Sequence, residues 1–110
     1  MKIHLIRRET VERYVSANAS SKIGLLEWLL KIKYADWVIP GNIMETFPTA
    51  DLLGKGSSRV VFNIGGNKYR LIAKFHFGEM QVHLFICWIG THSEYDFICK
   101  NLKQYTISEY

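Results

Sequence analysis

Hydrophobic and polar residues alternate along three consecutive stretches in the second half of the chain. From Ser57 the sequence reads SRVVFNI, then NKYRLIAKFHF, then QVHLFICWI, with glycine-containing turns between the stretches. A period of two is typical of β-strands, because successive side chains point to opposite faces of a sheet. The pattern predicts an antiparallel meander of three strands, joined at Gly65-Gly66-Asn67 and at Gly78-Glu79-Met80.

The turns also predict which residues share a face of this meander. A two-residue turn in the first hairpin sets odd positions of one strand opposite even positions of the next. One face then carries the polar and charged residues together with a few apolar ones: Arg59, Val61, Asn63, Lys68, Arg70, Ile72, Lys74, His76, Gln81, His83, Phe85 and Cys87. The other face is apolar and is predicted to be buried: Val60, Phe62, Ile64, Tyr69, Leu71, Ala73, Phe75, Phe77, Val82, Leu84, Ile86 and Trp88.

The first half of the chain indicates one strand and two helices. The opening KIHLI predicts a strand, Thr10 is predicted to cap a first helix, and Ser20 or Ser21 a second. Apolar residues of the second helix recur at three- and four-residue spacing: Ile23, Leu26, Leu29 and Leu30, together with Trp28 and Ile32. We therefore predict an α+β fold in one domain over residues 1–110, with N-terminal helices packed on one face of a small antiparallel sheet.

The two connecting regions are less regular. Pro40, Gly41 and Pro48 indicate a loop-rich crossover between Tyr34 and Leu53, with one helical turn near residues 43–45. The final THSEYDFICKNL predicts a short helix or a capped turn.

Charge is distributed unevenly along the chain. The net charge is +4, but residues 52–78 carry five Lys or Arg and no Asp or Glu. A face with cations alone favours a polyanionic partner, whereas an ordinary solvated face usually mixes both signs. An anionic membrane is the weaker choice of partner, since no apolar stretch approaches the ~20 residues that span a bilayer. The N-terminus has no apolar leader, so we expect a cytoplasmic protein that does not bind membranes.

Neither a metal nor a disulfide is predicted. Cys87 and Cys99 are isolated thiols without a CxxC spacing, and no cluster of carboxylates could hold Mg²⁺. We expect no metal and no cofactor.

The stretches VVFNIGGNKYRLIAKF and GTHSEYDFI, preceded by YADW and FPTADLLG, resemble the HigB-type toxins of type II toxin–antitoxin systems. These toxins belong to the RelE-like superfamily of mRNA interferases, and the resemblance extends from about Tyr34 to Ile98. It implies a RelE/ParE-like fold with RNA on the open sheet face, and ribosome-dependent cleavage of translated mRNA without a metal. It also implies a hetero-oligomer with a cognate HigA-like helix-turn-helix antitoxin.

Metal-free RNA cleavage defines the candidate site residues. The 2′-hydroxyl must lose a proton, the phosphorane charge must be stabilised, and the leaving 5′-oxygen must gain a proton. We expect Arg70 and Lys74 to stabilise charge, and His92 and Tyr95 to transfer protons, although Tyr95 could instead stack on a base. RNA-backbone contacts are predicted for Lys55, Arg59, Asn63 and Lys68.

Other interpretations stay open at this point. Thr91 or Ser93 could cap the final helix with Glu94 in its first turn, leaving His92 and Tyr95 to pack there. Relatives often carry a basic residue at the position of Cys87, so the neutral thiol alters the usual distribution of charge. The chain could also be a non-catalytic RNA-binding toxin that blocks translation, a gyrase-directed toxin, or a degenerate toxin that only binds its antitoxin. His4, His76 and His83 are expected to be surface or structural histidines.

Overall fold

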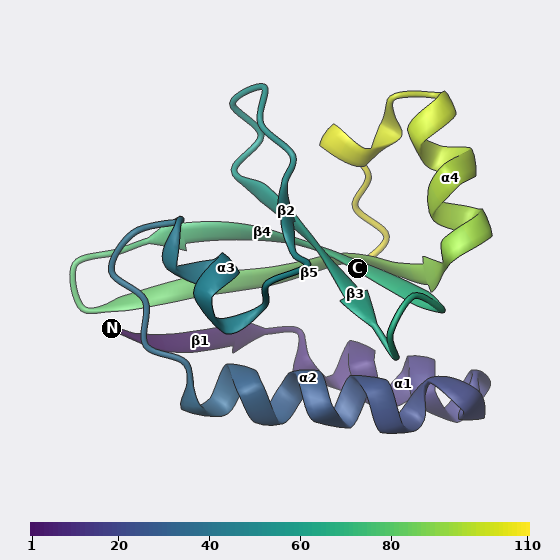
Figure 1. Cartoon of the computed structure of the whole chain (residues 1–110), viewed down its shortest axis with the longest axis horizontal. Coiled ribbons are helices and arrows are strands. Elements are labelled where there is room, and N and C mark those ends of the chain that lie inside the picture. The colour runs from purple at the N-terminus through teal and green to yellow at the C-terminus, as the bar shows by residue number, and fades with distance from the viewer.

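The computed structural model describes residues 1–110. Its elements follow in the order β1 (Lys2–Ile6), α1 (Arg8–Ala17), η1 (Ala19–Ser21), α2 (Lys22–Tyr34), α3 (Asn42–Thr46), β2 (Asp51–Leu52), β3 (Arg59–Ile64), β4 (Tyr69–Phe77), β5 (Gln81–Thr91), α4 (His92–Lys100) and η2 (Lys103–Tyr105). The strands form one sheet in the order β1-β5-β4-β3-β2. Helices α1 and α2 lie along one side of the sheet, and α4 with the C-terminal segment lies on the other (Figure 1).

The predicted meander is confirmed. Strand β4 pairs antiparallel with both β3 and β5, and Arg59 lies opposite Lys74 while Asn63 lies opposite Arg70. Odd residues of β3 therefore face even residues of β4, as the turn predicted. In the β3–β4 turn, Gly65 and Gly66 both have positive φ, at 61° and 69°, where residues with a Cβ are disfavoured.

The sheet is mixed, whereas the sequence predicted an antiparallel one. Strand β1 pairs in parallel with β5, from Lys2 beside Gln81 to Ile6 beside Phe85. A parallel pair needs a long crossover, and the chain between β1 and β5 supplies one that includes α1 and α2. The two-residue strand β2, which falls in the region predicted as a loop, extends the opposite edge.

A β-bulge in β5 changes the predicted faces. Ala73 pairs with Ile86, but Ile72 pairs with Trp88, so Cys87 is an extra residue in β5. Beyond the bulge the side chains of β5 exchange faces, because side-chain direction alternates residue by residue. The prediction that Trp88 lies on the helix-covered face is therefore wrong.

Two cores result, one on each face of the sheet. The large core joins α1, α2 and the segment around α3 to the sheet, and its members include Val11, Leu25, Trp28, Leu29, Ile32, Ile43, Phe62, Leu71, Leu84 and Ile89. The small core lies between the sheet and α4: Val61, Ile72, Cys87, Trp88 and Ile98, with Tyr95 packed against it. Trp88 reaches this second core only because of the bulge.

The helix starts and the buried side of α2 differ from the predictions. Helix α1 begins at Arg8, and Thr10 is buried inside it rather than capping it. Neither α1 nor α2 has a side-chain cap. The buried residues of α2 follow the spacing i, i+3, i+4, i+7: Leu25, Trp28, Leu29 and Ile32. Ile23, Leu26 and Leu30 form a second apolar stripe on α2 and are more than half exposed.

We expect Gly24→Ala to destabilise the protein. A Cβ at Gly24 would lie 2.5 Å from the nitrogen of Gly65 and 2.8 Å from its Cα, so helix α2 would have to move away from the β3–β4 turn. Overpacking of this kind costs about 1–3 kcal/mol, against a gain of about 1 kcal/mol in helix propensity. Urea unfolding should therefore give a lower midpoint.

Gly41→Ala is the matched control for this change. A Cβ there meets only the Cδ1 atom of Ile39, at 3.9 Å, and the backbone is compatible with alanine. Its unfolding midpoint should stay near that of the wild type. Equal midpoints for the two variants would contradict the close approach of α2 to the turn.

Candidate nucleic-acid interface

The C-terminal segment covers part of the sheet face that the sequence predicted to be open. Helix α4 begins with a capping box, in which the Thr91 side chain accepts from the Glu94 N–H and the Glu94 carboxylate accepts from the Thr91 N–H. After η2 the chain returns across the sheet, where the N–H of Glu109 donates to the carbonyl of Cys87 at 2.9 Å. The predicted Thr91 cap is confirmed, and the open face is smaller than expected.

Arg59 is buried under this segment. Its side chain is 7% exposed, and Nη1 donates to the carbonyls of Gln104 at 3.2 Å and Ile107 at 2.6 Å. These bonds fasten residues 104–107 to β3 and satisfy carbonyls that would otherwise be buried without a donor. No carboxylate neutralises Arg59, so its positive charge still contributes to the field of this face.

Arg70 is also buried, at 9% exposure. Its Nη2 donates to the side-chain oxygen of Asn67 at 2.6 Å, and its Nη1 donates to the carbonyls of Asn67 and Tyr69. The guanidinium carbon lies 6.0 Å from the centre of the Tyr95 ring. The expectation that Arg59 and Arg70 project into solvent is wrong, because backbone carbonyls of the turn and the C-terminal segment hold both.

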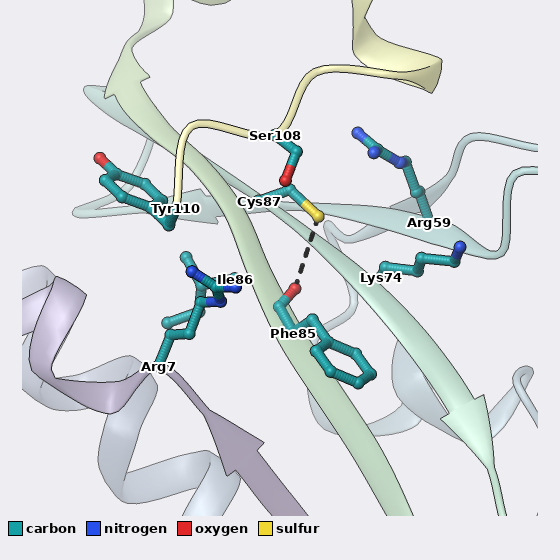
Figure 2. Close-up of a pocket in the computed structure, with 8 residues that line it drawn as sticks. All are labelled: Arg7, Arg59, Lys74, Phe85, Ile86, Cys87, Ser108 and Tyr110. Carbon is teal, nitrogen blue, oxygen red and sulfur yellow. Dashed lines mark hydrogen bonds between the residues drawn. The ribbon is translucent and has the colours of Figure 1, made fainter.

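A cationic pocket lies where β1, β3, β4, β5 and the C-terminal segment meet. Its volume is about 410 Å³, and its lining is Arg7, Arg59, Lys74, Phe85, Ile86, Cys87, Ser108 and Tyr110. Figure 2 shows Arg7 on one side of Cys87 and Lys74 with Arg59 on the other. Lys74 is exposed and has no hydrogen-bond or ion-pair partner. The pocket thus gathers three cations and no Asp or Glu.

Arg7 was not identified from the sequence. It precedes α1 in the left-handed backbone region, with φ 72°, a conformation that is uncommon for residues other than glycine. The parallel pairing of β1 with β5 brings this junction to the pocket. The only available signal was the pair Arg7-Arg8 directly after a predicted strand.

Burial keeps the Cys87 thiol and the Tyr110 phenol of the pocket protonated. Desolvation raises the pKa of the Cys87 thiol, and the opposing effect of Arg59 and Lys74 is smaller. Desolvation also raises the pKa of the Tyr110 phenol, and Glu109 adds to the effect. At neutral pH both groups are therefore neutral hydrogen-bond donors, and neither can serve as a base.

His92 and Tyr95 lie at the other end of the sheet face. Lys74 is four residues from Arg70 along β4, a separation of about 13 Å, and Tyr95 lies beside Arg70. His92 Nδ1 is 3.7 Å from a carboxylate oxygen of Asp96, and the His92 N–H donates to the carbonyl of Lys68. Burial raises the pKa of Tyr95 more than Arg70 lowers it, so this phenol too stays protonated.

The remaining predicted residues do not line the pocket. The ammonium of Lys55 lies 4.9 Å from the centre of the Tyr105 ring. Asn63 and Lys68 line two separate hollows beside Gly24 of α2. Of the eight residues predicted from the sequence, the structure brings only Arg59 and Lys74 together in the pocket.

Comparison with known proteins identifies the family. Residues 21–98 match the model of the HigB toxin family, described as the RelE-like toxic component of a toxin–antitoxin system. The chain belongs to this family. Its partner is accordingly an antitoxin, and its α+β structure is consistent with RelE-like toxins.

Curated relatives cover most of the chain. It is 24% identical over 102 residues to "mRNA interferase HigB" of Escherichia coli O6:H1, covering 93% of this chain and 97% of the relative. It is 27% identical over 95 residues to "mRNA interferase toxin HigB" of E. coli K12 and to "mRNA interferase HigB" of Shigella flexneri, covering 86% of this chain and 89% of each relative. None of its helices has the length and apolar character needed to cross a membrane.

We expect the stability of the fold to decrease as pH rises above about 10, the ordinary pKa of tyrosine. The pKa of Tyr95 is raised in the folded state, so its contribution is complete below that value and is lost as pH approaches the folded pKa. Tyr95→Phe should therefore lose less stability than the wild type over this range. Urea unfolding at a series of pH values measures the difference.

Tyr34→Phe controls for the general effect of alkaline pH. Tyr34 is 68% exposed on α2, so its variant should follow the wild-type curve. If Tyr95→Phe and the wild type lost stability in parallel, the Tyr95 phenol would not be desolvated as described.

Proposed function

We propose that this HigB-family toxin is a cytoplasmic endoribonuclease that cleaves translated mRNA on the ribosome without a metal ion, restrained by a HigA-like helix-turn-helix antitoxin. The observation that carries the proposal is the pocket that joins Arg7, Arg59 and Lys74. Curated relatives named as mRNA interferases support it. The lining also disfavours Mg²⁺, since it offers cations and no Asp or Glu to coordinate the ion.

The pocket suits one nucleotide and its phosphate. Its volume of about 410 Å³ falls within the usual range for small-ligand sites, about 300–1,000 Å³. Lys74 can approach a phosphate as a free ammonium, and Arg7 can do so from the opposite side of Cys87. Phe85, the partner of Lys74 across β4 and β5, is 37% exposed and offers a ring on which a base can stack.

The proposed reaction is attack by the neighbouring 2′-hydroxyl group. The O2′ atom passes its proton to water and bonds to phosphorus, the bond from phosphorus to O5′ breaks, and O5′ takes up a proton from water. The products carry a 2′,3′-cyclic phosphate and a 5′-hydroxyl. Lys74 and Arg7 stabilise the charge that develops on the phosphorane oxygens, and the protonated phenol of Tyr110 is a hydrogen-bond donor beside them.

In this proposal the ribosome holds the mRNA in the orientation that cleavage requires. Cys87 and Tyr110 are protonated at neutral pH, so the pocket has no evident general base. Holding the mRNA with its 2′-hydroxyl in line with the scissile bond contributes to catalysis through orientation alone. His92 lies further along the same face and would contact a neighbouring part of the mRNA, whereas the guanidinium of Arg70 is already bonded to Asn67 and Tyr69.

The same observation supports a second candidate function. A cationic pocket without a base can bind RNA without cleaving it, so the chain could be a toxin that blocks translation by occupying mRNA. Both functions use Lys74 and Arg7, and they differ in whether the message is cut.

Removal of either free cation should strongly reduce cleavage of mRNA. We expect Lys74→Ala and Arg7→Ala each to reduce cleavage by about 10²–10³-fold, the usual cost of removing one donor to a developing oxyanion. Primer extension on a translated mRNA, after induction without antitoxin, should show new 5′ ends for the wild type only. Ligation at those ends should require prior phosphorylation, because the proposed chemistry leaves a 5′-hydroxyl.

Lys22→Ala is the matched control, since Lys22 is an exposed lysine on α2, on the other side of the sheet. It should cut mRNA like the wild type. Growth arrest without new 5′ ends would replace the nuclease proposal with the translation-blocking one. Full cleavage by Lys74→Ala would remove the pocket from the mechanism.

A further inference from the structure

Three of the four histidines form a row across the sheet. His4 of β1 is the register partner of His83 of β5, and His83 is the register partner of His76 of β4. Register partners on neighbouring strands stand about 5 Å apart with their side chains on the same face. None of the three forms an ion pair with a carboxylate. The row therefore presents three imidazoles side by side, and the proposed nuclease reaction uses none of them.

Two of these rings direct the same nitrogen at each other. His4 Nδ1 and His83 Nδ1 are 3.2 Å apart and share a hydrogen bond, with the ring centres 5.4 Å apart and the planes at 71°; a metal ion bound between them would replace this bond. Two imidazole nitrogens bound to one tetrahedral ion, each at about 2.0–2.1 Å, would be separated by about 3.3 Å. The pair thus already has the spacing of two ligands that share a metal ion.

Gly78 lies close to one edge of the His83 ring. A Cβ at Gly78 would lie 3.7 Å from both Cδ2 and Nε2 of His83, so this edge of the ring rests over the glycine. Nδ1, on the other side of the ring, then faces His4. His83 is half-buried, which reduces the entropy that a bound ion would have to take from its side chain.

His76 provides a third imidazole within reach. Its ring is stacked on that of His83, with centres 6.0 Å apart and planes at 24°. No three ligating side chains converge in this arrangement, so the preformed part of the site is the His4–His83 pair. His76 is exposed, so packing does not fix its side chain in the stacked position. Three imidazoles with one water are a familiar coordination set for zinc.

The three imidazole ligands indicate which class of metal ion this site would bind. Neutral imidazoles without carboxylates suit zinc, copper or nickel, whereas Mg²⁺ and Ca²⁺ require oxygen ligands. Lys74 is the nearest cation along β4, two residues from His76 and about 7 Å away by strand rise. The high dielectric constant of the surrounding water reduces the repulsion at this exposed site, so Lys74 weakens the binding of a cation without preventing it.

We propose that His4 and His83, with His76 as a third ligand, bind a divalent transition-metal ion, with Zn²⁺ as the reference ion. Bound metal cross-links the edge strand β1 to β5. This inference does not depend on the nuclease mechanism, because the row lies outside the lining of the cationic pocket. It does bear on that pocket, since β1 leads directly into Arg7 and His83 lies two residues from Phe85.

Titration of the tag-free protein with ZnCl₂ tests the proposal. Calorimetry, with competition by a chromogenic chelator, should give about one zinc per chain with an affinity in the micromolar range or tighter. His4→Gln and His83→Gln should each weaken binding by about tenfold or more, and His76→Gln should weaken it less. Glutamine keeps a polar side chain at each position, and circular dichroism verifies the fold.

His92→Gln is the matched control, because His92 is the one histidine outside the row. It should bind zinc like the wild type. Zinc should also raise the melting temperature of the wild type and of His92→Gln, but not that of His83→Gln. Binding that is equal in the wild type and His83→Gln, or that is lost in His92→Gln, would overturn the proposal.

Discussion

The β-bulge at Cys87 is the feature on which the arrangement of the second sheet face depends. One extra residue in β5 turns Trp88 away from the large core and toward α4. The indole then completes a small core with Ile72 and Ile98, which gives α4 a surface to pack on. Gly90 accommodates this change, because a Cβ there would lie 2.3 Å from the Trp88 ring. Without the bulge, α4 and the segment after it would lose the contribution of Trp88 to this small core.

The bulge also shapes the cationic pocket. The segment that follows α4 returns across β5 at the bulged residue, where Glu109 bonds to the Cys87 carbonyl. Arg59 holds the same segment through two backbone carbonyls. The cations of this face thus have different tasks: Arg59 and Arg70 stabilise the fold, while Lys74 and Arg7 keep their hydrogen-bonding capacity for a ligand. All of them contribute positive potential, because no carboxylate pairs with them.

The alternation of side-chain direction along a strand explains why so much of the sheet could be predicted from the sequence. Alternation and turn chemistry determine strand pairing locally, so the register of β3 with β4 and the burial of Val60, Phe62 and Leu71 could be predicted. The bulge could not be predicted, because no residue type typical of β-bulges stands at Cys87 in the sequence. Trp88 was therefore assigned to the wrong face.

The candidate site was predicted less well because it depends on distant segments. The burial of Arg59 arises from carbonyls 45 and 48 residues away, and no periodicity along β3 contains that information. The same holds for Arg7, which reaches the pocket through a parallel strand pair that the meander pattern does not reveal. Charge counting located the cationic region, but it could not distinguish the arginines held by backbone from the residues left free.

The parallel pairing of β1 with β5 has a consequence for how the protein matures. Strand β1 is synthesised long before its partner β5. The parallel β1–β5 ladder, which begins with Lys2 beside Gln81, can form only after β5 has been made. Contacts so distant in sequence are made late, after most of the chain has been synthesised. Because Arg7 and Tyr110 line the same pocket, its complete lining can form only after both residues have been synthesised, so the cationic pocket is among the last features of the fold to take shape.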